Sequence, residues 1–393
     1  MNNFMFYAPT RVIFGKDEEN NTGKYVKAEG GTNVLIHYGG GSAVRSGLLD
    51  RVKASLTAEG IAFEELGGVQ PNPRSSLIYK GIDLCREKGI DFVLAVGGGS
   101  TIDSAKAIAA GAVYDGDFWD FYQGKWIEEA LPLATILTIA AAGSEGSPDS
   151  VVTKEVEGGD LKRDAHGEVI RPRFSILNPA LTQTVSPYQT ACGITDIMAH
   201  LFERYFTNTP EVGTSDRLIE GLLMSMIDEA PRVMADPDNY DARANIMWAG
   251  MLAHNNVCGV DRDQDWSSHT IEHELSGLYD CAHGAGLAVV FPAWMKYVYK
   301  HDAVRFARLA ARIWKCELNE KDPEETALAG IAALQKFWKS IGMPSTIAEL
   351  SGKEEDIDFL AHMACYGDVR EGSFGGFVEL QEDDVKAILK LAL

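Results

Sequence analysis

The sequence lacks the features that mark secreted, membrane-spanning and nucleic-acid-binding proteins. Its N-terminus has neither a basic start nor an apolar run, and no stretch approaches the ~20 apolar residues that span a bilayer. Basic residues are few: 36 Lys and Arg face 57 Asp and Glu, and the net charge of −21 would repel a phosphate backbone. The six cysteines form no C-x-x-C pair and are interpreted as reduced thiols. These absences predict a cytoplasmic protein with no nucleic-acid and no membrane partner.

The sequence also contains neither the G-x-G-x-x-G fingerprint nor a Walker A loop. Its first half instead alternates short apolar runs with helical patterns, which is typical of a parallel α/β sheet. We expect strands at residues 33–38, 61–66, 92–96 and within 131–142, and helices at 43–59 and 74–88.

Beyond about residue 186 the strand pattern disappears. Long amphipathic helical stretches follow, such as residues 219–234 and 303–316. A chain of 393 residues can bury two ordinary cores. We therefore predict an α/β domain over residues 1–185 and an all-α domain over residues 186–393.

Four residues of the second half form a plausible ligand set for one metal ion. Asp196 and His200 are four apart, so on a helix their side chains leave the same face. His269 and His283 follow fourteen residues apart, and one carboxylate with three imidazoles suits Zn²⁺ or Fe²⁺. His273 shares a helical face with His269, so spacing alone leaves either of them as a ligand.

Two glycine-rich turns follow expected strands, at residues 39–42 and 97–100. Glycines let the backbone approach a ligand closely, and the start of a helix presents free N–H groups to a phosphate. A single such turn is as easily a plain tight turn, but two suit a dinucleotide. NAD-selective folds commonly place an acid against the ribose 2′-hydroxyl. Since no acid lies between Tyr38 and Asp50, NADP(H) is predicted over NAD(H).

Taken in order, these motifs resemble the iron-containing alcohol dehydrogenase family, in particular its NADP(H)-dependent butanol dehydrogenase and aldehyde reductase branch. The resemblance spans nearly the whole chain. Besides the metal and glycine motifs, it includes residues 6–15, 71–74, 96–106, 143–145 and 172–179.

The resemblance implies a Rossmann-like dinucleotide-binding domain, a helical metal-binding domain and an active site between them. It implies that the metal ligands are Asp196, His200, His269 and His283, and that His273 takes part in proton transfer. It also implies cofactor contacts from a set of residues in the first half, namely Gly39, Gly40, Ser42, Asn72, Gly98, Gly99, Ser100, Asp103, Thr138 and Lys162.

The implied reaction is hydride transfer between NADP(H) and a primary alcohol or aldehyde, such as butanol or butanal, with Fe²⁺ or Zn²⁺ polarising the substrate oxygen. An edge segment at residues 5–14 predicts a homodimer. Two departures concern the cofactor region: Ala142 stands where the family usually has threonine, and residues 146–149 are unusual.

Three alternatives compete with this interpretation. A glycerol dehydrogenase-like polyol oxidoreductase would share the fold and the metal position. Residues 269–273 match the H-x-x-E-H pattern of zinc peptidases, but a peptidase leaves Asp196, His200 and both glycine turns unexplained. A nucleotide-binding regulator without catalysis would not need an intact ligand set.

Overall fold

The computed structural model describes residues 1–157, 160–367 and 370–393. The described chain forms two compact units, one of residues 7–185 and one of residues 1–6 with 186–393. The predicted fold class, an α/β part followed by a helical part, is confirmed. The predicted domain ranges stay predictions, and the first six residues group with the helical unit.

The α/β unit is built on a six-stranded sheet in the order β1-β8-β5-β4-β2-β3, in which every pairing is parallel. Its central strands are almost wholly apolar, as expected for strands covered on both faces. The strands are β1 (Arg11–Phe14), β2 (Asn33–Gly39), β3 (Ala62–Val69), β4 (Phe92–Gly97), β5 (Leu133–Leu137) and β8 (Phe174–Leu177). A separate antiparallel pair consists of β6 (Asp149–Lys154) and β7 (Leu161–His166).

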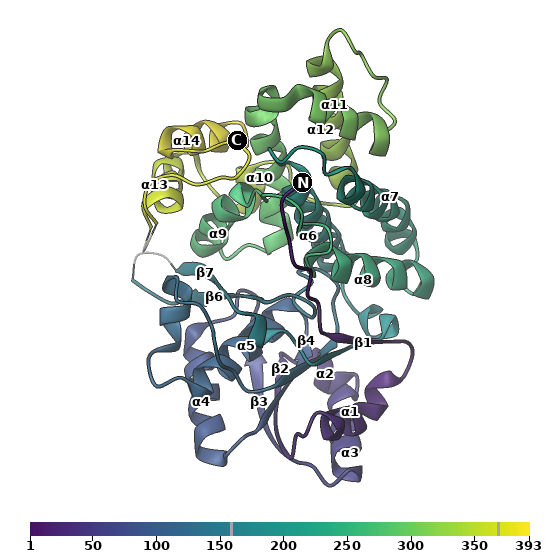
Figure 1. Ribbon diagram of the computed structural model, residues 1–393, viewed down its shortest axis with the longest axis vertical. Coiled ribbons are helices and arrows are strands. Elements are labelled where there is room, and N and C mark those ends of the chain that lie inside the picture. The colour runs from purple at the N-terminus through teal and green to yellow at the C-terminus, as the bar shows by residue number, and fades with distance from the viewer. Residues whose placement is uncertain (158–159, 368–369) are drawn as a thin grey trace. The chain divides into compact units, whose positions relative to one another are not determined.

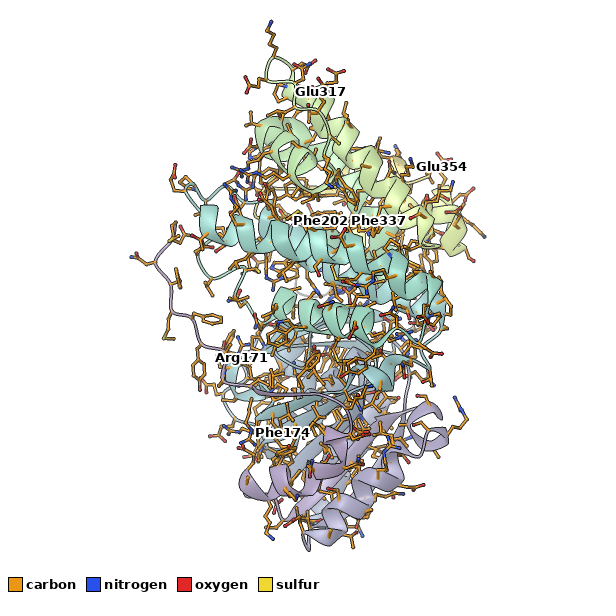
Figure 2. All side chains as sticks on the ribbon, turned by 90° about the vertical axis from the view of Figure 1, so that its right-hand side faces the viewer. Arg171, Phe174, Phe202, Glu317, Phe337 and Glu354 are labelled. Atoms are coloured by element: carbon orange, nitrogen blue, oxygen red, sulfur yellow. The ribbon has the colours of Figure 1, made fainter. Side chains whose placement is uncertain are left out.

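Helices cover both faces of this sheet (Figure 1). They are α1 (Thr22–Ala28), α2 (Ser42–Arg45), α3 (Leu48–Ala58), α4 (Ser75–Lys88) and α5 (Gly99–Val113). One core joins α1 and α3 to alternate residues of the strands, among them Phe174, which is labelled in Figure 2. The opposite face carries His37, whose Nε2 lies 2.8 Å from Ser104 Oγ of α5. The single helix predicted at residues 43–59 is wrong: Gly47 has a φ of 70° and separates α2 from α3.

The order in which strands are added to the sheet reverses between β2 and β4. From β2 the chain continues to β3 at one edge, and from β4 it continues to β5 on the other side. In open α/β sheets, ligands bind beyond the carboxyl ends of the strands at such a switch point. Gly39 is the last residue of β2 and Gly98 follows β4, and in these adjacent strands Tyr38 pairs with Val96. The topology therefore brings the two predicted glycine turns together.

The helical unit contains no strand among the residues the structure describes, only an isolated bridge between Phe374 and Leu380. Its aromatic core includes Phe202, labelled in Figure 2, whose ring lies 5.6 Å from that of Phe291. Its helices are α6 (Pro187–Tyr205), α7 (Gly213–Ala235), α8 (Tyr240–His254), α9 (Ser267–Tyr279), α10 (His283–Val298), α11 (Ala303–Ile313), α12 (Pro323–Ser340), α13 (Ile357–Tyr366) and α14 (Glu382–Lys390).

Short 3-10 helices connect these elements, at Glu18–Asn21, Phe118–Gln123, Glu168–Ile170, Pro179–Thr182, Tyr299–Asp302, Ile347–Leu350 and Glu354–Asp356. Within the described parts of the chain, no helix combines the length and the apolar character that crossing a bilayer requires.

Candidate active site

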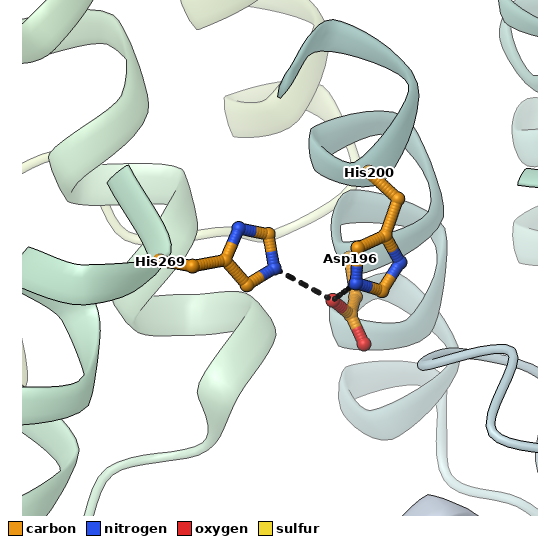
Figure 3. A group of neighbouring side chains, drawn as sticks. All are labelled: Asp196, His200 and His269. Atoms are coloured by element: carbon orange, nitrogen blue, oxygen red, sulfur yellow. Dashed lines mark ion pairs between the residues drawn. The ribbon is translucent and has the colours of Figure 1, made fainter. Parts of the chain in front are cut away.

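Three histidine rings surround one carboxylate oxygen in the helical unit. Asp196 and His200 lie on α6. The N-cap residue of this helix is Ser186, whose hydroxyl accepts a hydrogen bond from the Gln189 amide at 3.2 Å. The Nε2 atoms of the three imidazoles lie 3.6 to 3.8 Å from Asp196 Oδ1, in His200, His269 and His283. Figure 3 shows Asp196, His200 and His269 converging from two helices.

The donor set fits a divalent metal ion. Bonds of ~2.1 Å at tetrahedral angles put neighbouring ligand atoms ~3.4 Å apart, close to the spacings observed here. Asp196 Oδ1 and His269 Nε2 are buried and have no hydrogen-bond partner among the described residues. Buried polar atoms normally have a partner, so atoms that face one another without a bond indicate a site for an ion.

The surroundings set the charge of these histidines. Burial, together with the imidazoles of His254 and His269 and the Arg204 guanidinium, holds the pKa of His200 well below its ordinary value. Burial also lowers the pKa of His269, but Glu203 and Asp196 outweigh it and raise that pKa to about 9. His200 is therefore neutral and has a lone pair for a metal ion, whereas the two carboxylates beside His269 favour its protonated form, whose Nε2 proton a bound cation would displace.

His273 lies beside this group on α9. Its ring centroid is 5.8 Å from that of His283 and 6.5 Å from that of His269. Glu272 is wholly buried, contacts His283 Nδ1 and accepts a hydrogen bond from the Ser276 hydroxyl. A glutamate held in this way is not available as the base of a peptidase, so the geometry disfavours the H-x-x-E-H alternative.

The glycine turns of the α/β unit have two different environments. A Cβ added at Gly40 would meet no atom within 4 Å, so the backbone there is open to a ligand. A Cβ at Gly98 would lie 2.1 Å from Ile139 Cγ2, so packing within the protein already requires glycine there. Gly98 is the N-cap residue of α5, in which Gly99 and Ser100 are the first residues. This helix start offers the unpaired N–H groups that suit a phosphate.

The other predicted cofactor residues lie in several places in the same unit. Thr138 follows β5, and its amide donates to Gly97 O at 2.9 Å, beside the second glycine turn. Asn72 has a φ of 53° in the loop before α4, and Lys162 lies buried in β7. Asp103 lies on α5, and both its oxygens accept hydrogen bonds within the protein, from Ser144 Oγ at 2.5 Å and from the Val151 amide at 3.2 Å.

A buried lysine, not singled out from the sequence, fixes the loop at residues 143–149, which includes the unusual residues 146–149. Lys106 Nζ donates to Ser144 Oγ at 2.9 Å, to Ser147 O at 2.9 Å and to Asp149 O at 2.7 Å. Burial lowers its pKa to about 8, against the opposing effects of Asp103 and Asp149. The motif of residues 96–106 therefore ends in a structural cation.

Glu203 is a second residue that sequence reasoning missed. It follows Asp196 and His200 on the same face of α6, at seven and three residues, and its Oε1 lies 3.0 Å from His269 Nδ1. The helical spacing could have indicated its position. Its partner could not be read from the sequence, because His269 lies on another helix.

A metal-type Asp and His group in a helical unit, with a dinucleotide-type sheet in the other unit, defines a class of metal-dependent dehydrogenases. Comparison with known families agrees. Residues 9–179 match the model of iron-containing alcohol dehydrogenases, and residues 190–393 match the C-terminal model of the same family. The chain belongs to the iron-containing alcohol dehydrogenase family and is an NAD(P)-dependent enzyme of this type.

Similar proteins include both NADH-dependent and NADPH-dependent enzymes. A probable NADH-dependent butanol dehydrogenase 2 of Bacillus subtilis is 44% identical over the full length of both chains. The NADPH-dependent aldehyde reductase YqhD of Escherichia coli is 36% identical over 89% of each. The crystal structure of an NADH-dependent butanol dehydrogenase A from Thermotoga maritima has a TM-score of 0.96 at 38% identity, covering 100% of this chain and 99% of that one. These relatives leave the preferred nucleotide open.

Proposed function

We propose that this chain is an NADP(H)-dependent dehydrogenase of small primary alcohols and aldehydes, such as butanol and butanal. Its metal would be one Fe²⁺ or Zn²⁺ ion, held by Asp196, His200, His269 and His283. The observation that carries the proposal is the convergence of three imidazole Nε2 atoms within 3.6 to 3.8 Å of one buried carboxylate oxygen. Names of similar proteins support the substrate class, since they include butanol dehydrogenases and an aldehyde reductase.

The bound ion would supply a Lewis acid that polarises a carbonyl oxygen or lowers the pKa of an alcohol. The chain's own residues prepare the place for that chemistry. Asp196 contributes the negative charge that offsets part of the ion's charge, and burial of the group limits competition from water. His273, next to His283, would hold or deliver the proton that the substrate oxygen exchanges.

NADP(H) is proposed because the first glycine turn carries a cation and no acid. The α2 residue Arg45 extends its guanidinium over Gly41, where an added Cβ would meet Nη1 at 2.1 Å. A ribose 2′-phosphate near Gly39, Gly40 and Ser42 would be within the influence of this charge. The start of α5 would take the pyrophosphate, with Asn72, Thr138 and Lys162 as further contacts.

A homodimer is proposed from the edge of the sheet. β1 pairs with β8 on one side only, and the preceding Met5 and Tyr7 are exposed. Pairing of an edge strand with that of a second copy would protect this edge. Size-exclusion chromatography with light scattering measures the mass of the protein in solution. A monomer at all concentrations would contradict this part of the proposal.

The test of the main proposal combines metal analysis with turnover. The purified enzyme should contain up to one Fe or Zn ion per chain. With butanal as substrate, it should oxidise NADPH faster than NADH. With hydroxyacetone, the ketone that a polyol oxidoreductase would reduce, both nucleotides should be oxidised more slowly than NADPH is with butanal. His283→Ala should lose both the metal and the activity. His362→Ala, an exposed histidine of α13, serves as the matched control and should retain both. Full activity of a metal-free His283→Ala enzyme would disprove the assignment.

A further inference from the structure

Two buried glutamates lie behind two of the proposed metal ligands. Glu203 Oε1 is 3.0 Å from Nδ1 of His269, and Glu272 Oε2 contacts Nδ1 of His283. The Nε2 atoms of the same two rings are those that face Asp196 Oδ1. Each imidazole therefore has a carboxylate on one nitrogen and the proposed metal position on the other.

The fold places Glu203 by helix periodicity and by a helix start. Glu203 lies on α6, on the face that carries Asp196 and His200. Its Oε1 also accepts the backbone N–H of His269 at 3.1 Å, in the first turn of α9. One carboxylate thus fixes both the main chain and the ring of the same histidine.

Glu272 is accommodated by a glycine on the neighbouring helix. A Cβ added to Gly286 of α10 would lie 2.6 Å from Glu272 Oε1, so only glycine leaves room for the carboxylate. The Ser276 hydroxyl occupies the same Oε1 atom, which leaves Oε2 directed at His283. Gly284 likewise lets the start of α10 approach α6, because a Cβ there would lie 2.1 Å from Cys192 O.

We propose that Glu203 and Glu272 are positioning residues for the metal centre. Each accepts the Nδ1–H of its histidine, which leaves the lone pair on Nε2, turns the ring toward the ion and raises its basicity. The inference rests on the proposed metal site and deepens it. His200 has no such support, since its Nδ1 has no hydrogen-bond partner within the described residues.

The experiment measures metal affinity, because turnover alone would not separate positioning from catalysis. Wild type, Glu203→Gln and Glu272→Gln are stripped of metal, and Zn²⁺ and Co²⁺ binding is measured against a chromophoric chelator. Each variant should bind about 10- to 100-fold more weakly than wild type. Glu274→Gln is the matched control: Glu274 is buried on α9 but pairs with Arg370, and its variant should stay within about twofold of wild type. Glu272→Asp, which keeps the carboxylate, should bind the ions more tightly than Glu272→Gln.

Unchanged affinity in both glutamine variants would overturn the positioning role while leaving the metal site intact. Failure of the wild type to bind either ion would instead overturn the proposed function. If a variant does not fold, Zn²⁺-loaded wild type labelled with ¹⁵N-histidine decides the matter. All three ligand histidines should show metal-bound Nε2 and protonated Nδ1, but only in His269 and His283 should the Nδ1 proton be shifted downfield by a hydrogen bond to a carboxylate. Unshifted Nδ1 protons in both, or binding through Nδ1, would refute the inference.

Discussion

Two clusters of ionisable groups lie in the interior of this chain, one in each unit, and they differ in how their hydrogen bonds are satisfied. In the α/β unit, Lys106 and Asp103 lie among hydroxyls and carbonyls, and each is bonded several times within the protein. In the helical unit, Asp196 Oδ1 and His269 Nε2 face each other at 3.8 Å, too far apart for a hydrogen bond. The groups of the first cluster satisfy one another, whereas the second cluster contains buried polar atoms that have no hydrogen-bond partner among the described residues. Buried ionisable groups thus indicate a ligand site only where their polar atoms have no hydrogen-bond partner within the protein.

The self-contained cluster should be the more damaging one to break. Lys106→Met keeps the length of the side chain but removes the cation, leaving Ser147 O and Asp149 O buried without their donor. Removing one partner of a buried charged network costs ~3–5 kcal/mol. Urea unfolding should show a loss of this size, and Lys80→Met on the exposed face of α4 should change stability by less than ~0.5 kcal/mol. Equal effects of the two substitutions would contradict a structural role for Lys106.

Histidine itself provides the next comparison, through pH. His37 is wholly buried with both ring nitrogens bonded, to Leu66 O at 2.9 Å and to Ser104 Oγ, and burial lowers its pKa to about 4. Between pH 6.5 and 4 the unfolded chain binds a proton at this residue that the native state does not. The free energy of unfolding therefore falls as the pH drops through this range, by ~3 kcal/mol in total, and is unaffected above it.

His37→Gln removes this contribution. Unfolding free energies of wild type and variant, measured from pH 7 to pH 4, should converge by ~3 kcal/mol toward the acid end. Groups that titrate in both proteins cancel in the difference. A difference that stays constant with pH would mean that His37 has the same pKa in the native and the unfolded state, which would contradict the effect of burial.

The sequence drew attention to the candidate metal ligands and not to the Lys106 and Asp103 cluster, for a physical reason. Asp196 and His200 are joined by helix spacing, and histidine is rare enough that His269 and His283 attract notice. The alternating strands and the glycine turns likewise predicted the α/β sheet. Spacing could not choose between His269 and His273, because both leave one face of α9, and the family resemblance was needed for that choice.

The residues that were missed act through partners distant in the chain. Lys106 donates hydrogen bonds to residues of the 143–149 loop, and Glu203 contacts the ring of His269, 66 residues away in the sequence. Such pairings depend on how the elements pack, which no local pattern encodes.

The break at Gly47 was missed because residues 43–59 keep a helical apolar pattern on both sides of it. Glycine within such a pattern can mark a boundary as well as a tolerated interior residue.

Binding of a divalent cation should affect the second cluster and leave the first unchanged. Zn²⁺ at about 100 times its dissociation constant should stabilise the stripped wild type by ~2.7 kcal/mol. Hydrogen exchange should slow in peptides from α6, α9 and α10, while peptides from β4 and α5 keep their rates. Asp196→Asn, which preserves the size of the side chain, should abolish both effects. Equal protection of β4 and α5 would show that the ion acts through general stabilisation.

A pair of hydroxyl deletions makes the finest test of the comparison. Ser175 Oγ accepts from Thr135 Oγ1 at 2.8 Å and donates to Glu145 O at 2.6 Å, so Ser175→Ala leaves two buried groups without partners. This substitution should cost ~1–2 kcal/mol.

Thr195, beside Asp196, is wholly buried, and its Oγ1 has no hydrogen-bond partner in the described chain. Thr195→Val keeps the shape, removes an unsatisfied hydroxyl and should be neutral or stabilising by up to ~1 kcal/mol. Thermal and urea unfolding of both variants measure the difference. A loss at Thr195 as large as that at Ser175 would mean that the helical cluster is satisfied after all, and the contrast between the two clusters would fail.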